Sequence, residues 1–241
     1  MNWVGYAQIG LYITLLALCA PRLGGYMAKV YAGERTWLTP LARPTERMIY
    51  RLSGIDPAAE MRWTTYARSL LSFSVVGFLA LLVMQMAQRL LPLNAGQLPS
   101  VPWALALNTA TSFMTNTNWQ AYAGEVTLSD FTQMVGLGVQ NFLSAATGMA
   151  VLVALARGLA RRSAGAIGNF WVDLVRSIVY VLLPLSLALA MALVSQGVVQ
   201  TFAPNAVTHT LAGATQTIPL GPAASQVAIK QLGTNGGGFF G

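Results

Sequence analysis

Charged residues are scarce in this chain of 241 residues: Asp, Glu, Lys and Arg make up 9% of it, against 55% hydrophobic residues. Because a typical soluble domain carries about 25% charged residues, this chain could not cover a globule in water. Its hydrophobic residues form continuous runs of about 20 residues, the length of a membrane-spanning helix, whereas the strands of a membrane barrel alternate. We therefore expect an all-α polytopic membrane protein.

Cysteine and histidine are nearly absent, with one of each. Cys19 lies in the first hydrophobic run, cannot form an internal disulfide, and is expected to be a buried structural thiol. His209, the single histidine, lies in a polar stretch. With one histidine the chain cannot form a histidine-rich metal site. A GxxxxGK[ST] loop is also absent, which excludes a P-loop nucleotide site.

Four hydrophobic runs, at about 3–20, 69–91, 131–156 and 171–196, are predicted to span the bilayer. Twelve of the 14 Lys and Arg residues lie in the connections that follow the first and third runs or, in the case of Arg176, just inside the start of the fourth run. By the positive-inside rule those connections are cytoplasmic, so the N-terminus, residues 92–130 and the region after the fourth run face outward. Asp173, near the start of the fourth run, is expected to pair with Arg176 as a helix-start charge pair.

An uncharged polar stretch, TSFMTNTNWQ at 111–120, follows a short apolar segment between the second and third runs. Ser100 and Pro102 are predicted to be the N-cap and first position of a helix. About 12 residues make roughly 18 Å of helix, too short to cross a core of about 30 Å. The chain must therefore enter from outside, stop and return, which is tolerated only where the backbone is buried in protein or lines a water-filled cavity.

This geometry suits a cation. The C-terminal end of such a helix carries about half a negative charge, and the following backbone carbonyls can replace the hydration shell of an ion. The loop has no carboxylate, which favours a monovalent ion over a divalent one. The chain repeats the plan at PAASQVAIKQLG and GTNGGG, with Thr115-Asn116 aligned on Thr234-Asn235. Alone, GGG is usually a flexible linker, but the repetition favours a filter.

Several motifs resemble the A-subunit family of the bacterial Kdp-type potassium-transporting ATPases: LALNTATSFMTNTNWQAYAGE, QNFLSAATG, NFWVDLVR and GPAASQVAIKQLGTNGGGFFG. The resemblance implies repeated helix–pore-loop–helix units of the potassium channel and transporter type, four of them around one filter. It implies an extra N-terminal helix and cytoplasmic loop at 1–68, a first repeat at 69–160, and the start of a second repeat at 161–241.

The resemblance also implies the site and its partners. The potassium-binding filter residues it gives are Thr115, Asn116, Thr117, Asn118, Gly233, Thr234, Asn235 and Gly236, with Gln120 beside the filter entrance. K⁺ is the bound substrate, and no covalent cofactor or nucleic acid is implied. Because the DKTGT phosphorylation motif is absent from this chain, ATP hydrolysis is expected in the B subunit, with small C and F subunits alongside. The implied location is the bacterial inner membrane.

Family members have about twice this length, so either the chain is a fragment or another chain completes the filter. Three functions remain open at this point. The first is the potassium-selecting subunit of an ATP-driven pump, itself without catalytic residues. The second is a passive potassium channel or secondary transporter of the same superfamily, and the third is a membrane scaffold whose loops only pack.

Overall fold

The computed structural model describes residues 3–160 and 165–241, so Arg161 and Arg162 of the predicted basic connection lie outside the described residues. The helical elements, including a 3₁₀ turn and two π-helical segments, are α1 (Trp3–Ala32), α2 (Thr39–Ser53), α3 (Trp63–Met86), Gln88–Leu90 (3₁₀), α4 (Trp103–Met114), α5 (Gly124–Thr127), Thr132–Gly138 (π), α6 (Val139–Ala160), α7 (Phe170–Arg176), Ser177–Leu182 (π), α8 (Leu183–Ser195) and α9 (Ala223–Leu232). Two strands, β1 (Ala206–His209) and β2 (Thr215–Ile218), form an antiparallel hairpin.

Four helical stretches in the described part of the chain are long and apolar enough to cross a membrane: Trp3–Ala32, Trp63–Met86, Thr132–Ala160 and Phe170–Ser195. This confirms the all-α polytopic prediction. The first stretch is longer than expected, because the helix continues through Pro21 to Ala32. One turn before that proline, the carbonyl of Leu18 accepts a hydrogen bond of 2.6 Å from the Arg22 guanidinium.

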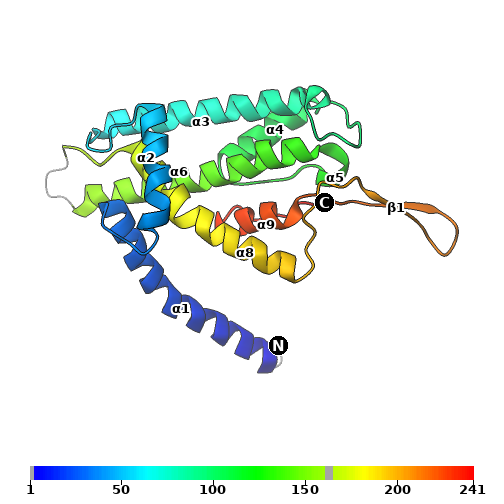
Figure 1. The fold of residues 1–241 in the computed structure, drawn as a ribbon, viewed down its shortest axis with the longest axis horizontal. Coiled ribbons are helices and arrows are strands. Elements are labelled where there is room, and N and C mark those ends of the chain that lie inside the picture. The colour runs from blue at the N-terminus through cyan, green and yellow to red at the C-terminus, as the bar shows by residue number, and fades with distance from the viewer. Residues whose placement is uncertain (1–2, 161–164) are drawn as a thin grey trace.

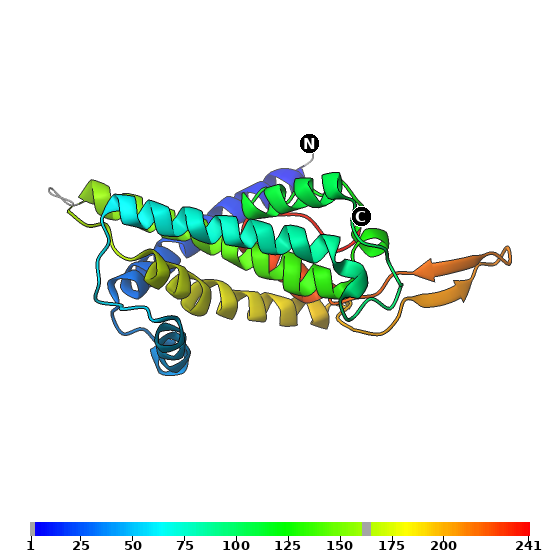
Figure 2. The ribbon, with the colours of Figure 1, turned by 90° about the horizontal axis from the view of Figure 1, so that it is seen from above.

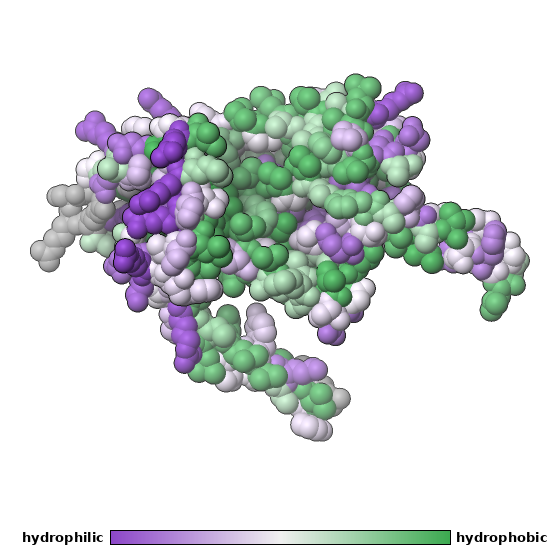
Figure 3. Space-filling view, in the orientation of Figure 1, coloured by the Kyte–Doolittle hydropathy of each residue, from purple (hydrophilic) through white to green (hydrophobic). Residues whose placement is uncertain are grey.

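The helices α3, α6 and the α7–α8 stretch pack together, while α1 leans away and touches the others only near its C-terminal end (Figures 1 and 2). Small residues of α6, among them Ala146 and Ala150, allow close packing against Tyr66 and Phe170. Hydrophobic side chains cover the middle of the body, and strongly hydrophilic ones gather at the end where α2 lies (Figure 3). Such a band between polar ends is what a bilayer requires.

Pro184 lies near the start of α8, and the structure shows how the hydrogen bond that it cannot make is replaced. A proline has no N–H for the carbonyl four residues earlier, which is that of Tyr180. A π-helical segment, Ser177–Leu182, precedes the proline. The freed carbonyl of Tyr180 accepts a hydrogen bond of 2.8 Å from the Tyr26 hydroxyl instead. The proline therefore also fixes α1 against this helix.

Several expectations were wrong. Cys19 is exposed, because α1 buries only Val30 and Tyr31 against the rest of the chain. Ser100 is not the N-cap of α4; Pro102 occupies that position without a side-chain hydrogen bond. Residues 22–68, the charge-rich segment after the first run, contain the end of α1, the whole of α2 and the start of α3. The β1–β2 hairpin was not expected at all, and it projects from the end opposite α2 (Figure 1).

Candidate potassium-binding site

Two short helices end beside one another inside the bundle. Helix α4 packs on α3 and ends at Met114, and α9 packs on α8 and ends at Leu232. Both begin near the hairpin end and run only part of the way along the bundle (Figure 1). The chain then turns into 115–118 in one case and 233–238 in the other. The predicted pair of half-spanning helices with polar loops is therefore present, and the C-terminal, electronegative end of each helix adjoins its loop.

The two loops fold back on their helices with the same hydrogen bonds. The backbone N–H groups of Thr117 and Asn118 donate to the carbonyl of Ser112 at 3.0 and 3.2 Å. Those of Asn235 and Gly236 donate to the carbonyl of Lys230 at 3.1 and 3.2 Å. The loops are thus two copies of one local structure.

Left-handed backbone conformations recur at matching places in these loops. Asn116 and Asn118 have φ values of 64° and 53°, and Thr234 and Gly236 have values of 59° and 75°. The structure therefore equates Asn116 with Thr234 and Asn118 with Gly236, one residue out of step with the predicted alignment of Thr115 on Thr234. Asparagine tolerates this conformation and glycine adopts it freely, which explains their use here.

The threonine hydroxyls and asparagine amides of the loops point to different surroundings. Thr115, Thr117 and Thr234 are exposed, and the hydroxyls of Thr115 and Thr117 lie 3.0 Å apart. Asn118 and Asn235 are buried, and Asn116 is half-buried. The open face of the site therefore carries hydroxyls and backbone, while the amides face the protein.

The amides join the two loops to each other and to α6. Asn116 donates through Nδ2 to the carbonyl of Gly233 at 3.3 Å and accepts at Oδ1 from Asn235 and, at 2.7 Å, from Ser144. Asn118 donates to Oδ1 of Asn141 at 2.5 Å. These bonds hold the loops on the side that faces the protein. Most of the oxygens that remain available to bind an ion are therefore backbone carbonyls.

Sequence reasoning missed Asn141 and Ser144 as part of this site. Both lie on one face of α6, three residues apart, within a hydrophobic span. Polar residues in such a span are costly and usually face the protein interior or a cavity, a signal that could have identified them. Gln120 lies beside the second loop, where its Oε1 accepts a hydrogen bond of 3.4 Å from Lys230. The structure brings every predicted filter residue into this one region.

A second polar cluster lies at the opposite end of the helices, near α2. Asp173, 1% exposed in its side chain, is paired with Arg157 at 2.6 Å and not with Arg176 as predicted. Arg176 instead pairs with Glu46 of α2 at 3.0 Å. Asp173 and Arg176 lie one turn apart, but the neighbouring helices supply partners with better geometry.

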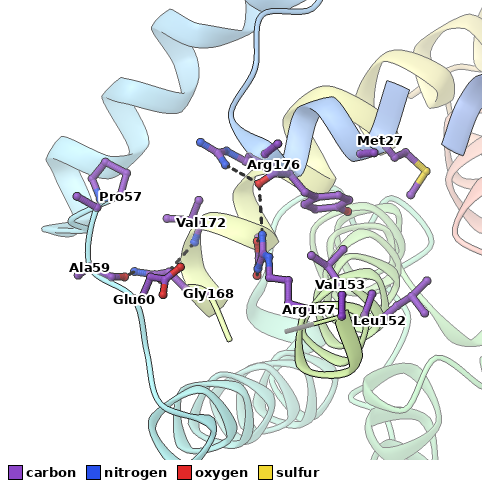
Figure 4. Close-up of a pocket in the computed structure, with 18 of the residues that line it drawn as sticks. Met27, Pro57, Ala59, Glu60, Leu152, Val153, Arg157, Gly168, Val172 and Arg176 are labelled. Carbon is purple, nitrogen blue, oxygen red and sulfur yellow. Dashed lines mark hydrogen bonds and ion pairs between the residues drawn. The ribbon is translucent and has the colours of Figure 1, made fainter. Parts of the chain in front are cut away.

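The two arginines of this cluster converge on one carbonyl. Arg157 and Arg176 both donate to the backbone oxygen of Tyr31, at 3.3 and 3.2 Å (Figure 4). They border a pocket of about 830 Å³ between α1, α6 and α7. The cluster therefore fixes the C-terminal end of α1 to the bundle.

Glu46 is the carboxylate at the α2 side of this cluster. It accepts hydrogen bonds from the hydroxyls of Tyr50 and Tyr180, at 2.8 and 2.7 Å, as well as from Arg176. Burial raises its pKa, but the hydrogen bonds from Tyr180, Tyr50 and Arg176 outweigh burial and leave the pKa below its ordinary value. Glu46 is a structural anion that holds α2 against the span.

Comparison with known proteins agrees with this architecture. Residues 10–241 match the family model described as the potassium-transporting ATPase A subunit. A relative from Pseudomonas entomophila (strain L48), named potassium-transporting ATPase potassium-binding subunit, is 58% identical over 241 residues, which are 100% of this chain and 43% of the relative. Relatives of the same name from Pseudomonas aeruginosa and Herpetosiphon aurantiacus are 60% and 59% identical, over 95% and 97% of this chain and 41% and 42% of their own lengths.

This chain thus spans less than half the length of the curated relatives it matches. The described part of the structure has four apolar helices able to cross a membrane, and the family match includes both polar loops. The protein is a multi-pass membrane protein, and the chain belongs to the family of potassium-transporting ATPase A subunits.

Proposed function

We propose that this chain is part of the potassium-selective binding and translocation subunit of an ATP-driven K⁺ uptake pump. The observation that carries the proposal is the hydrogen bond between Asn116 and Asn235, which joins the polar loops of the two repeats. We call this pair of asparagines the bracket between the repeats. The names of the relatives support potassium as the ion and an ATPase as the complex. K⁺ is the cargo of this site and not a resident cofactor.

In this proposal backbone carbonyls do most of the coordination. They belong to Thr115, Asn116, Thr117 and Asn118 in the first loop and to Gly233, Thr234, Asn235 and Gly236 in the second. Neither segment contains a carboxylate, so the field is that of neutral dipoles, which suits a monovalent ion that must be released again. Gln120 stands beside the entrance.

The charge distribution supports the orientation of the chain. By the positive-inside rule, the proposed orientation has α2 and the Glu46 cluster in the cytoplasm, and the N-terminus and the β1–β2 hairpin outside. We accordingly place the protein in a bacterial inner membrane, where the filter loops take K⁺ from the outer face. The proposed division is an extra helix with cytoplasmic segment at 1–68, a first repeat at 69–160 and the start of a second at 161–241.

The pump would hydrolyse ATP on another subunit. The names of the relatives support this division, since they describe a potassium-binding subunit of a potassium-transporting ATPase. A B subunit that hydrolyses ATP, with small C and F subunits, completes the proposed complex. The exposed face of α1 would lie against lipid or against these partners.

The test uses the complete complex, purified with the full-length subunit that contains this chain. ATP hydrolysis is measured against K⁺ and Na⁺ concentration, together with thermal unfolding in each salt. We expect micromolar-to-millimolar K⁺, but not Na⁺, to stimulate hydrolysis and raise the unfolding temperature. Potassium flux that persists without ATP would instead indicate a passive channel or secondary transporter. Absence of any K⁺-specific stabilisation would indicate a scaffold.

A further inference from the structure

Lys230 is a buried cation beside the filter loops. It lies in the last turn of α9, and its side chain has 0% exposure. Within residues 3–160 and 165–241 it forms no ion pair with a carboxylate. A buried ammonium without a counter-ion is expensive, so the groups that surround it must compensate. Its contacts therefore define what it does.

The ammonium is held by neutral oxygens and a ring. Nζ donates to the carbonyl of Gly238 at 2.6 Å and to Oε1 of Gln120 at 3.4 Å. It also lies 5.5 Å from the centre of the Phe113 ring, within the range of a cation–π interaction. A hydrogen bond from a charged donor to a buried carbonyl is stronger than a hydrogen bond between neutral groups.

These partners come from both repeats. Phe113 and Gln120 flank the first filter loop, one before it and one after it, and Gly238 is the last residue of the second loop. The main-chain carbonyl of Lys230 meanwhile accepts the N–H groups of Asn235 and Gly236. One residue thus fixes the second loop at its start and at its end and ties it to the first.

We infer that Lys230 is a positioning residue for ion selectivity, a fixed internal cation that occupies the Gly238 carbonyl and locks the spacing of the two filter loops. Because a positive charge lies 2.6 Å from this oxygen, a K⁺ ion bound there would be repelled, and the row of coordinating carbonyls ends before Gly238. The inference rests on the proposed function. It adds a determinant outside the filter loops themselves.

The test replaces Lys230 by methionine, which keeps the unbranched stem and removes the charge and the donors. In the complete complex, K230M is expected to raise the K⁺ concentration that half-stimulates ATP hydrolysis by about tenfold and to admit Rb⁺ or Na⁺ as activators. The maximal rate should stay within about twofold, because the hydrolytic site is elsewhere. A matched control is K29M, the same substitution at an exposed lysine of α1.

A lysine needed only for folding would lower the yield and the maximal rate with an unchanged half-saturating K⁺ concentration, and that result would overturn the inference. If K230M does not assemble into the complex, the same measurement on F113L tests the inference instead. This variant keeps an apolar side chain but removes the ring under Nζ. F113L is expected to raise half-saturation about threefold, and an unchanged value would again overturn the inference. If the unmodified complex shows no K⁺ stimulation, the proposed function itself fails, which is a separate outcome.

Discussion

Asn235 donates a side-chain hydrogen bond to Asn116, so the two asparagines of the repeated Thr-Asn pairs hold each other. The sequence alignment treats them as equivalent, yet the structure uses them as unlike partners. Asn116 has a left-handed backbone and Asn235 does not. The same oxygen of Asn116 also accepts from Ser144 of α6. The bracket that joins the repeats is therefore asymmetric.

The first prediction concerns this bracket. Asn116→Ala and Asn235→Ala should each raise the half-saturating K⁺ concentration for ATP hydrolysis about tenfold, roughly 1.4 kcal/mol of lost binding. Because the two side chains are joined by a direct hydrogen bond, the effect of the double variant should be clearly smaller than the sum of the two single effects. Asn94→Ala is the matched control: it lies in the connection between α3 and α4, and its side chain forms hydrogen bonds with Leu98. Fully additive effects would contradict the bracket.

The second prediction concerns pH. The pKa of Glu46 is lowered in the folded protein, so its ionised form stabilises the fold above the ordinary pKa of a glutamate, and this stabilisation is lost as pH falls through the lower folded value. Glu46→Gln should lower the free energy of unfolding by about 2 kcal/mol at neutral pH, since it weakens hydrogen bonds to a charged group.

Thermal unfolding of both proteins from pH 7 into the acid range measures this effect. The difference in unfolding temperature between the unmodified protein and Glu46→Gln should shrink as the carboxylate protonates. A difference that is constant with pH would show that Glu46 contributes packing and not charge.

The membrane spans and the two short helices with polar loops were predictable because each rests on a local signal. A hydrophobic run of span length has one stable form in a bilayer, and the Thr-Asn loops follow helices too short to cross it. The potassium-binding roles of residues 115–118 and 233–236 came from the family resemblance and stay a prediction. The mutual register of the two loops could not be predicted, because Thr115-Asn116 and Thr234-Asn235 look identical in sequence while their backbones differ by one position.

The sequence could not predict which charged residues of different helices form ion pairs. Arg176 lies one turn after Asp173, and spacing alone pairs them. The actual partners, Arg157 for Asp173 and Glu46 for Arg176, depend on how α6 and α2 approach the fourth span. Lys230 lies in the last turn of α9, and only the fold shows that it is buried among uncharged groups, one of which is the Phe113 ring of α4.

The third prediction tests the buried pair of Asp173 and Arg157. Arg157→Met leaves a nearly fully buried carboxylate without its cation and should destabilise the protein by about 3–5 kcal/mol. The double variant Arg157→Met, Asp173→Leu removes both charges and should regain most of that loss, because an apolar pair avoids the desolvation cost. Arg51→Met, at an exposed position of α2, is the control. Chemical or thermal unfolding in detergent measures all three, and a double variant as unstable as Arg157→Met would contradict the argument.

The fourth prediction concerns Gly124, where the chain that leaves the first filter loop passes the chain that leaves the second. A Cβ at this position would overlap the backbone oxygen of Phe239 and lie 2.7 Å from Nε2 of Gln133, which itself donates to that oxygen. Backbone cannot move aside as a flexible side chain can, so the exit of the second loop must shift.

Gly124→Ala should therefore cost about 1–3 kcal/mol of stability, the usual range for overpacking, and should also weaken K⁺ stimulation because the loop is displaced. Gly148→Ala in α6 is the matched control, since a Cβ there meets nothing within 4 Å and alanine is the better helix former. Its unfolding temperature and half-saturating K⁺ concentration should be unchanged or improved. If Gly124→Ala behaved like Gly148→Ala in both measurements, the close crossing of the two filter exits would not constrain the site, because the second loop would have room to yield.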